Sequence, residues 1–437
     1  MMRSLFSGVA GLKTHQTRMD VIGNNIANVN TTSYKSSSMN FSDMLYQTTQ
    51  AATGASTTTD RAGTNARQIG LGAQTAAIST SMNAGSAETT NSPYDLYITG
   101  DSFFIVSANG DSNYLYTRDG AFTVDEEGTF CVAANGYPVM GYRTTTDTSG
   151  ATVVDSSSLK TLPIMSADNK TSEPSETTKA YVTGIIDAED TDFDTTTGKT
   201  VQLSFVDNEG YEYTGTFAIT QDTSTSPYSY KVNLANIKDA SGNEVTAGVT
   251  FNEVTLAFNN KGTLAATTGD LSFTSPVSTS TQTITLDFST LTSYANNGHS
   301  TVTANAGTSS TDTTGSGWKT GNMTGIKIGT DGTITGTYSN GQSKLLGKIP
   351  TATFANVYGL EKQGDNMYAA SQNTGAITIG DVTSGGGKMT TGQLEMSNVD
   401  LASEFTRMIT TQRGFQANSR IITVSDTLLE ELTNLKR

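Results

Sequence analysis

Apolar residues recur every three or four positions near the start of the 437-residue chain. This spacing predicts an amphipathic helix over residues 4–29, with Gln16 as a polar break in its apolar stripe. Residues that favour turns follow from Asn28 to Thr32, so the helix is expected to end there. The stripe consists of Leu5, Val9, Leu12, Met19, Ile22, Ile26 and Val29.

The other end of the chain predicts a second helix, over residues 398–437. Ser397–Asp400 offers a capping-box start, and Asp400 and Glu404 suit the positive end of a helix dipole. A helix of this length would be about 60 Å long, too long to bury itself within one small domain. Its first stripe is Leu401, Phe405, Met408, Phe415, Ile422 and Leu429, with Gln412, Ser419 and Asp426 as polar interruptions, and a second is Ile421, Val424, Leu428, Leu432 and Leu435.

Two amphipathic helices at opposite ends of the chain suggest an antiparallel pair, with the rest of the chain as an excursion between them. The alternative is that each helix caps a domain of its own. All seven prolines lie between Pro93 and Pro350. A proline inside either helix would cost about 3 kcal/mol, so its absence from both ends agrees with the helical prediction.

The sequence between the helices is typical of β structure. Residues 94–143 consist of short β-rich runs separated by dipeptides such as Asn109-Gly110 and Asp119-Gly120, which favour hairpins. The same pattern continues at lower density over 145–318 and tightens again over 319–395.

The expected fold is mixed and mainly β: a nested multidomain chain with paired terminal α-helices as a coiled-coil-like stem and two or more discontinuous β-rich domains. The predicted parts are a helical domain of 1–30 with 397–437, an extended connecting segment of 31–93, a β-rich inner domain of 94–144 with 319–396, and an inserted outer β domain of 145–318.

The composition argues against several classes of partner and activity. The formal charge of −15 argues against a nucleic-acid partner, which needs clustered basic residues. One cysteine and two histidines argue against a zinc site or a catalytic triad, so no enzyme activity, metal or cofactor is expected. No apolar run of about 18 residues predicts a membrane span, and the first residues lack a signal-peptide core. The Ser/Thr-rich, Cys-poor composition nevertheless looks extracellular, which implies another route of export.

Several motifs have a simple structural interpretation. Asp125–Gly128 and Asp331–Gly336 lack the spacing of a calcium loop and predict turns. Gly385–Lys388 lacks the spacing of a phosphate-binding loop and also predicts a turn. Cys131, within a β run, is expected to be a small buried apolar residue. The acidic tract Asp187–Asp194 is expected to be a solvated loop rather than a metal site.

Both ends of the chain resemble one known family. Met19–Lys35 (MDVIGNNIANVNTTSYK) is similar to the N-terminal signature of bacterial flagellar rod and hook proteins, and Ser397–Leu401 and Gln412–Arg420 are similar to their C-terminal signature. Thr99–Phe104 extends the match. The resemblance is strongest to the hook members, through Asp331–Asn340, Ala355–Leu360 and Gly364–Tyr368.

Length also favours the hook members, because the distal rod members are expected to be much shorter and to lack the middle insertion. The chain departs from the family pattern at Ser33 and Ser102, where glycine is usual. Gly414 stands inside the predicted C-terminal helix, where glycine costs roughly 1 kcal/mol relative to alanine.

The resemblance implies a structural subunit that self-assembles into a curved helical tube. Such a tube acts as a flexible universal joint that transmits motor torque from rod to filament. The implied partners are copies of the same chain, the distal rod protein, the hook cap scaffold, the hook–filament junction protein and the flagellar type III export apparatus. The implied location is the extracellular flagellar hook of the basal body, reached without a cleaved signal or membrane insertion.

Residues of the two helices are the predicted assembly interface, and Phe41 with Leu45 resembles a short export motif. Two alternatives remain: another axial subunit of the distal rod type, and a secreted β-rich surface protein such as an adhesin or hydrolase, which leaves the paired helices unexplained. The predicted interface residues are Leu5, Val9, Leu12, Met19, Ile22, Asn24, Asn25, Ile26, Asn28, Leu401, Phe405, Met408, Gln412, Phe415, Asn418, Ile422 and Leu429.

Overall fold

The computed structural model describes residues 2–55, 62–109, 113–147, 152–193, 197–222, 229–265 and 267–434. These residues form two compact units. Unit 1 comprises Met1–Ser166, Ile326–Thr335 and Leu345–Arg437, and unit 2 comprises Ala167–Gly325 and Gly336–Lys344. The finer four-part division of the sequence stays a prediction. The fold is mainly β with a helix at each end of the chain, as predicted.

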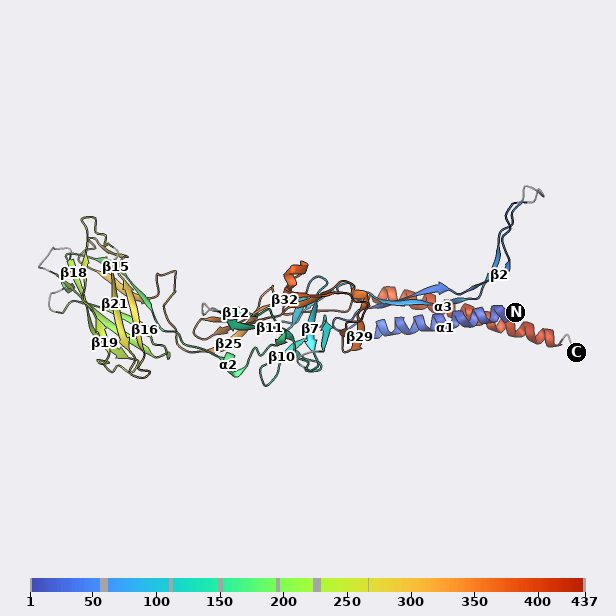
Figure 1. The fold of residues 1–437 in the computed structure, drawn as a ribbon, viewed down its shortest axis with the longest axis horizontal. Helices are drawn as coiled ribbons and strands as arrows, with labels where there is room; N and C mark the ends of the chain where they lie inside the picture. The colour runs from blue at the N-terminus through green and yellow to red at the C-terminus, as the bar shows by residue number, and fades with distance from the viewer. Residues whose placement is uncertain are drawn as a thin grey trace. The chain divides into compact units, whose positions relative to one another are not determined.

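Unit 1 contains the two long helices, which lie side by side (Figure 1). Helix α1 spans Met2–Ala27 and α3 spans Leu401–Asn434, close to the predicted ranges; residues 435–437 lie outside the described part of the chain. The pair is antiparallel, because Gly8 approaches Ile421 and Ile422 while His15 approaches Gly414. Of the two arrangements that the sequence allowed, the antiparallel pair is therefore confirmed.

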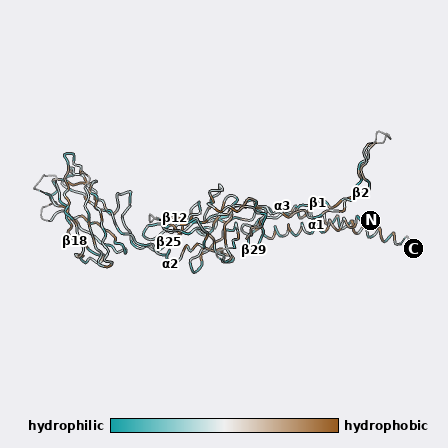
Figure 2. Tube along the Cα trace, in the orientation of Figure 1, coloured by the Kyte–Doolittle hydropathy of each residue, from teal (hydrophilic) through white to brown (hydrophobic). Residues whose placement is uncertain are grey.

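Local chemistry explains where α3 begins. The Asp400 carboxylate accepts a hydrogen bond from the backbone N–H of Ala402 at 3.0 Å, so Asp400 is the N-cap. Helix α1 ends where Asn28 donates through its side chain to the carbonyl oxygen of Asn24 at 2.9 Å. Figure 2 shows hydrophobic and hydrophilic residues interspersed along both helices. Among the described residues, none of the helices has the length and hydropathy needed to cross a membrane.

A long β-hairpin follows α1. Strand β1 (Ser37–Asp43) pairs antiparallel with β4 (Ala73–Thr80), and β2 (Tyr46–Gln50) pairs with β3 (Arg67–Gly70). The low-complexity tract 47–59 therefore enters this hairpin, although residues 56–61 lie outside the described part of the chain. Most side chains of the hairpin are exposed, so its β1–β4 portion depends on contacts with α1 for support.

The core of unit 1 lies on a sheet whose strand order is β29-β30-β8-β7-β28-β31. Strands from both sides of the insertion share this sheet, since β7 pairs with β28 and β8 pairs with β30. Its buried face contributes Phe103, Ile105, Tyr116 and Phe354 to a hydrophobic cluster that also includes Met140. The strands are β7 (Phe103–Ser107), β8 (Tyr114–Thr117), β28 (Thr351–Phe354), β29 (Glu361–Gly364), β30 (Met367–Ala369) and β31 (Ile377–Gly380).

Shorter pairs complete unit 1. Strand β5 (Ala87–Thr89) pairs with β33 (Gln393–Glu395), β6 (Leu96–Ile98) with β32 (Met389–Thr391), and β9 (Phe122–Val124) with β10 (Phe130–Val132). The first two pairs bring the segment before α3 beside the segment that follows the hairpin. The remaining elements outside the sandwich, which belong to one unit or the other, are β11 (Met140–Thr146), β12 (Thr152–Val154), β13 (Lys160–Thr161), α2 (Ala167–Lys170), β14 (Thr171–Ser172), β25 (Gly321–Ile328), β26 (Thr333–Tyr338), β27 (Ser343–Lys348), η1 (Thr191–Phe193), η2 (Val357–Gly359) and η3 (Val382–Gly385).

Unit 2 contains a β-sandwich. One sheet has the order β16-β17-β18-β20, and the other contains β19-β21-β22-β15 with β23 and β24 beside β15. Burial alternates along β17, as expected for a strand with one face on a core. Aromatic and aliphatic residues of both sheets, including Phe205 and Phe273, form one buried cluster. The strands are β15 (Lys179–Ile186), β16 (Lys199–Val206), β17 (Glu212–Gln221), β18 (Ser229–Asp239), β19 (Val249–Phe251), β20 (Val254–Ala257), β21 (Thr268–Thr274), β22 (Thr281–Asp287), β23 (Leu291–Ser293) and β24 (Thr301–Ala306).

The motifs interpreted as turns are turns: Gly128, Gly332 and Gly386 all have positive φ. Cys131 is a buried free thiol whose pKa is raised by burial, as expected for a small core residue. No group of three or more potential metal-ligating residues occurs within the described ranges.

The acidic tract corrects the sequence interpretation. Asp187 is only 2% exposed, and its carboxylate accepts backbone hydrogen bonds from Glu189, Asn296 and Gly298 at 2.5–3.0 Å. Asp190 accepts from the backbone N–H groups of Asp192 and Ser300 and from Lys199, and its pKa falls to about 2 because these hydrogen bonds outweigh desolvation. The prediction of a solvated loop was therefore wrong for Asp187 and Asp190, which brace neighbouring loops; Asp194 lies outside the described residues.

Candidate assembly interface

Where α1 and α3 meet, glycines of one helix leave room for larger side chains of the other helix. A Cβ atom added at Gly414 would lie 2.6 Å from His15 Cε1, and one added at Gly11 would lie 2.7 Å from Asn418 Nδ2. Both distances are shorter than any normal contact. Gly414, which from sequence alone only weakens the helix, is therefore required for His15 to fit. We call this contact the glycine seam, defined by Gly8, Gly11, His15, Gly414 and Asn418.

Buried hydroxyl groups continue along the same sides of the two helices. Thr14, Thr411 and Ser425 are each about 95% buried or more. Each hydroxyl donates to a backbone carbonyl four residues earlier in its own helix, at 2.7–3.1 Å. Small polar residues can therefore be buried here with their hydrogen bonds satisfied, and the helices approach closely without large apolar side chains between them.

His15 is packed between α3 and the hairpin. Its ring lies 5.3 Å from the ring of Phe41 in an edge-on arrangement, and the Arg18 guanidinium lies 5.1 Å from the centre of the same Phe41 ring. Burial, and then the neighbouring charge of Arg18, lowers the pKa of His15. His15 is therefore favoured in its neutral form at this contact.

The large apolar side chains lie mostly outside the seam. Val9 is 46% exposed, Phe405 50%, Leu401 39% and Phe415 37%. Most of the large residues of the predicted stripes therefore lie outside the surface on which α1 and α3 meet within one chain, although Ile422 packs beside Gly8 there. Among the remaining predicted interface residues, Asn24 and Gln412 are exposed, Ile22 and Asn25 are buried, and those of intermediate exposure are Leu5, Leu12, Met19, Ile26, Asn28, Met408, Asn418, Ile422 and Leu429.

Other exposed apolar side chains extend this surface. Phe6 is 64% exposed and Ile409 is 58% exposed, and the interface prediction named neither. Their positions carry the missing signal, because Phe6 lies three residues before Val9 and Ile409 lies four after Phe405. We define the outer apolar face by these exposed residues of α1 and α3: Met2, Phe6, Val9, Leu401, Phe405, Ile409, Phe415, Ile421, Val424, Leu428 and Leu432.

Two asparagines of the N-terminal signature, Asn24 and Asn25, make hydrogen bonds within the chain. Asn25 is fully buried; its side chain donates to the Ser37 carbonyl oxygen at 2.8 Å and accepts from the Ser37 N–H at 2.9 Å and the Tyr34 hydroxyl at 3.2 Å. Asn24 donates to the same Tyr34 hydroxyl at 3.1 Å. These contacts fix the end of α1 to the start of β1. Their contribution to contacts between subunits stays a prediction.

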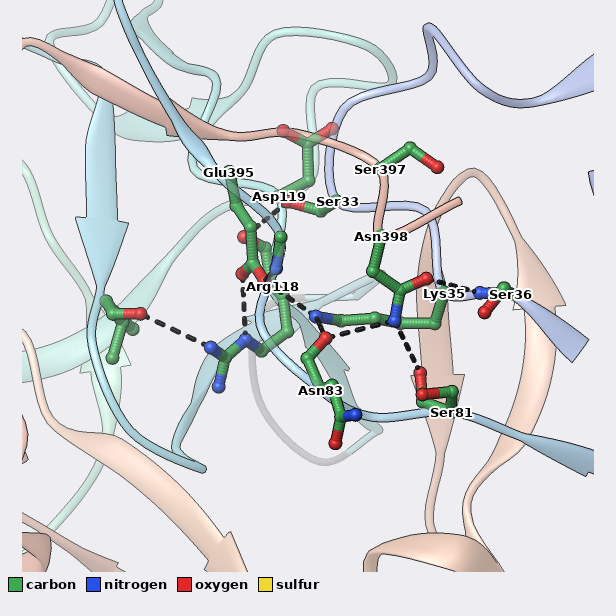
Figure 3. Close-up of polar contacts among 12 residues, drawn as sticks. Ser33, Lys35, Ser36, Ser81, Asn83, Arg118, Asp119, Glu395, Ser397 and Asn398 are labelled. Atoms are coloured by element: carbon green, nitrogen blue, oxygen red, sulfur yellow. Dashed lines mark hydrogen bonds and ion pairs between the residues drawn. The ribbon is translucent and has the colours of Figure 1, made fainter. Parts of the chain in front are cut away.

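A buried ionic cluster, which we call the collar, joins the helices to the β structure of unit 1 (Figure 3). Glu395 accepts from Lys35 Nζ at 2.6 Å and from Arg118 Nε at 3.0 Å, and all three side chains are at most 2% exposed. Arg118 also donates to the carbonyl oxygens of Gly100 and Ser102. Burial alone would raise the pKa of Glu395, but Arg118 and Lys35 hold it below its ordinary value.

Asn398 extends the collar to the segment just before α3. Its side chain accepts from the Ser36 N–H at 2.8 Å and donates to the carbonyl oxygens of Ser81 and Asn83 at 3.0 Å. Figure 3 shows Asn398 beside Lys35, which itself donates to the Asn83 carbonyl at 2.9 Å. Segments near positions 35, 82, 118 and 396 therefore meet at one place.

Ser33 lies at the edge of this cluster with a left-handed φ of 55°, the conformation for which glycine is preferred. Its hydroxyl donates to the Arg118 carbonyl oxygen at 2.8 Å, which offsets the backbone strain. Ser102, the other departure from the family pattern, is buried but has no such backbone strain.

The two residues of the predicted export motif differ in environment. Phe41 is 37% exposed and contacts His15 and Arg18 as described above, whereas Leu45 is 80% exposed. Their role in export stays a prediction.

Comparison with known proteins agrees with the helical ends and the β structure between them. "Flagella basal body rod protein" matches residues 5–35, "Flagellar hook protein FlgE/F/G D1 domain" matches 97–166, and "Flagellar basal body rod FlgEFG protein C-terminal" matches 390–435. These matches define the class as a flagellar axial protein.

The particular family follows from whole-chain relatives. The flagellar hook protein FlgE of Borreliella burgdorferi is 37% identical over 465 aligned positions that cover all of both chains. The chain belongs to the family of bacterial flagellar hook proteins. A solved structure of the Helicobacter pylori flagellar hook protein FlgE2 is 14% identical, with a TM-score of 0.46 over 71% of this chain and all of that one.

One relative corrects the argument from length. The flagellar basal-body rod protein FlgG of Bacillus subtilis is 28% identical over 439 positions, and the match covers all of both chains. Length and the middle insertion therefore do not separate hook from rod members of this family. The higher identity to the hook protein does favour the hook.

Proposed function

We propose that the chain is the structural subunit of the flagellar hook and polymerises with copies of itself through the outer apolar face. The supporting observation is that α1 and α3 meet through the glycine seam and leave their largest apolar side chains in solvent. Full burial of one such side chain is worth roughly 1.5–3 kcal/mol, so covering several of them favours association.

The length of the exposed helical surface suits lengthwise contacts with neighbouring copies. The outer apolar face runs along a helix of 34 residues, about 50 Å at 1.5 Å per residue. Such a face can be covered by helices of neighbouring copies arranged as in a coiled coil. When such a contact uses different surfaces of the two partners and does not close, it generates a helical tube.

Membership of the family extends the proposal to partners and location. The tube is a flexible joint that passes torque from rod to filament, with the distal rod protein at one end and the hook–filament junction protein at the other. Assembly takes place beneath the hook cap scaffold after export through the type III apparatus, without a cleaved signal. Contacts between polar, Ser/Thr-rich β surfaces are individually weak, which suits a tube that bends as it turns.

Electron microscopy of polymer formed by the purified chain tests the proposal. Curved tubes are the expected result. Straight rods would instead support a rod subunit, the second candidate that the Bacillus subtilis relative keeps open. Absence of polymer over a wide range of concentration and salt would contradict both assignments.

A further inference from the structure

Beyond its first two turns, α3 carries exposed charges in two separate groups. Arg413 and Arg420 lie near the middle of the helix, and three acidic residues follow them. All five side chains are exposed, and none of them belongs to an ion pair between described residues. The fold therefore leaves these charges available to a partner. The acidic residues are Asp426, Glu430 and Glu431.

Arg420 and Glu431 lie on the same side of α3, eleven residues apart. Eleven residues make almost three whole turns of an α-helix, so the two side chains leave the helix in nearly the same direction. Ile409 lies another eleven residues before Arg420, and Arg413 and Val424 form a second pair with the same separation one turn along. We call this side of α3 the eleven-residue row, defined by Ile409, Arg413, Arg420, Val424 and Glu431.

The eleven-residue row is not the side of α3 that packs on α1. Gly414, which contacts His15 across the glycine seam, follows Arg413 by one residue and therefore lies about 100° from it around the helix. The two apolar members of the row are well exposed, Ile409 at 58% and Val424 at 57%. The row is therefore accessible in the folded chain, where it offers apolar and charged side chains together.

A helical polymer restricts how two copies of this row can meet. Copies related by rotation about an axis and translation along it keep the same direction, so their α3 helices run parallel. Two parallel rows at the same level would bring each charge beside its own counterpart, and like charges at an interface are costly. A displacement of eleven residues, about 17 Å, removes this conflict, because Arg420 of one copy then lies level with Glu431 of the next. The aliphatic stem of Arg413 lies level with Val424 in the same register.

We propose that neighbouring copies of the chain contact each other along the eleven-residue row with this displacement, and that Arg420 of one copy pairs with Glu431 of the next. The proposal rests on the proposed function and specifies the partner of this surface: a second copy in one register. Because the paired charges occupy different positions of one helix, the contact is heterologous and repeats from copy to copy. The ion pair selects the register, while the apolar side chains supply most of the attraction.

The test measures the critical concentration for polymerisation of the full-length chain by sedimentation at low salt. Arg420→Glu and Glu431→Arg each replace an attraction by a repulsion at every contact between copies. Each single variant is expected to raise the critical concentration about fivefold. The difference from wild type should shrink at about 1 M salt, where charges are screened beyond roughly 3 Å. A difference that does not depend on salt would overturn the proposal.

The charge swap decides whether the two residues act on each other. Arg420→Glu combined with Glu431→Arg restores opposite charges at the contact, so its critical concentration should return to within about twofold of wild type. A swap as impaired as the single variants, or single variants that polymerise like wild type, would overturn the pairing and leave the proposed function standing. Rescue of Glu431→Arg by Arg413→Glu instead of Arg420→Glu would overturn the register. If wild type forms no polymer, the proposed function fails and the pairing fails with it.

Glu430→Arg is the matched control. Glu430 is exposed, precedes Glu431 by one residue and lies about 100° from it around the helix, so this variant changes the net charge equally but leaves the row intact. Its critical concentration should stay close to that of wild type, and a rise equal to that of Glu431→Arg would overturn the proposal. The thermal midpoint of each dilute, monomeric variant should match wild type. A fall in Arg420→Glu that the swap does not reverse would assign the effect to folding and overturn the pairing.

Discussion

The helical pair of unit 1 and the β-sandwich of unit 2 differ in how far their large apolar side chains are buried. In the sandwich, aromatic and aliphatic side chains such as Phe273 and Leu286 are completely buried, and the exposed exceptions, Tyr211, Val277 and Tyr294, occur singly. In the helical pair, the helices approach most closely at the glycine seam, and many of the large apolar side chains are exposed. The sandwich has a complete core, whereas the helical pair leaves large apolar side chains exposed, and we propose that neighbouring copies cover them.

A charged residue on the outer apolar face should have the largest effect, because it should prevent polymerisation without changing the sandwich. Phe415→Asp should abolish polymerisation, because each contact would bury an unpaired carboxylate, while the thermal transition of the sandwich stays at its wild-type temperature. Electron microscopy and calorimetry measure the two effects. Val277→Asp, at an exposed apolar position of unit 2, is the matched control and should polymerise normally. Tubes from Phe415→Asp would show that the outer apolar face is not the interface.

The collar should be the most sensitive part of unit 1. Glu395→Gln leaves Lys35 and Arg118 buried with one carboxylate charge fewer, which should lower the free energy of unfolding by about 3–5 kcal/mol. Urea unfolding of the full chain would measure it. Glu361→Gln, at an exposed position of β29, should change that free energy by less than about 0.5 kcal/mol. Equal changes in the free energy of unfolding for the two variants would show that the collar does not stabilise unit 1.

The sandwich should respond to loss of packing alone. Phe273→Ala removes a ring that lies 4.7 Å from Tyr213 and 5.2 Å from Phe205, centre to centre. The expected loss is about 3–5 kcal/mol in the unfolding of unit 2, with the unfolding of unit 1 unchanged. Calorimetry resolves the two transitions. If both shifted together, the independence of the two cores would be disproved.

The glycine seam predicts that alanine has opposite effects at two helical glycines. Gly23 of α1 has nothing within 4 Å of an added Cβ, so Gly23→Ala should stabilise unit 1 by about 0.5–1 kcal/mol. Gly414→Ala would gain the same helix propensity but collide with His15, and should destabilise by about 1–3 kcal/mol. Denaturant midpoints give both signs. A stabilising Gly414→Ala would mean that the helices are not held this closely.

The smallest expected effect is on pH dependence. The pKa of His15 is lowered in the folded chain, so the unfolded chain binds the proton more readily. The stabilising contribution is therefore fully present above the ordinary pKa of about 6.5 and is lost as pH falls through the lower folded pKa. The thermal midpoint of unit 1 should fall slightly between pH 7 and pH 5. In His15→Gln this decrease should be smaller, and an identical decrease would exclude His15 as its source.

Local sequence patterns predicted the helices, but they could not predict contacts between residues that are far apart in the sequence. Spacing alone placed α1 and α3 within three residues at the ends that are described, and Asx–Gly pairs marked many of the turns. The collar could not be found in this way, because Glu395 lies 277 residues from Arg118 and 360 from Lys35. Asp187 was misassigned for the same reason, since its partners at 296 and 298 are remote in sequence.

The interface prediction shows a subtler limit. Periodicity identified apolar stripes but could not say which one faces the other helix and which faces solvent. Gly414 was the sequence signal for the surface that faces the other helix, because a glycine in a helix interior can indicate close approach of another element. Its meaning depends on His15, a residue nearly 400 positions away.

The separation of seam and outer face on one helix has a consequence for how such a chain can vary. Folding of the pair depends on positions such as Gly11 and Gly414, and attachment to other subunits is assigned to different positions of the same helices. Substitutions on the outside can therefore change which subunits fit together without disturbing the monomer. Successive segments of one axial structure could then be made from similar chains that differ in their outward-facing residues and still recognise their proper neighbours.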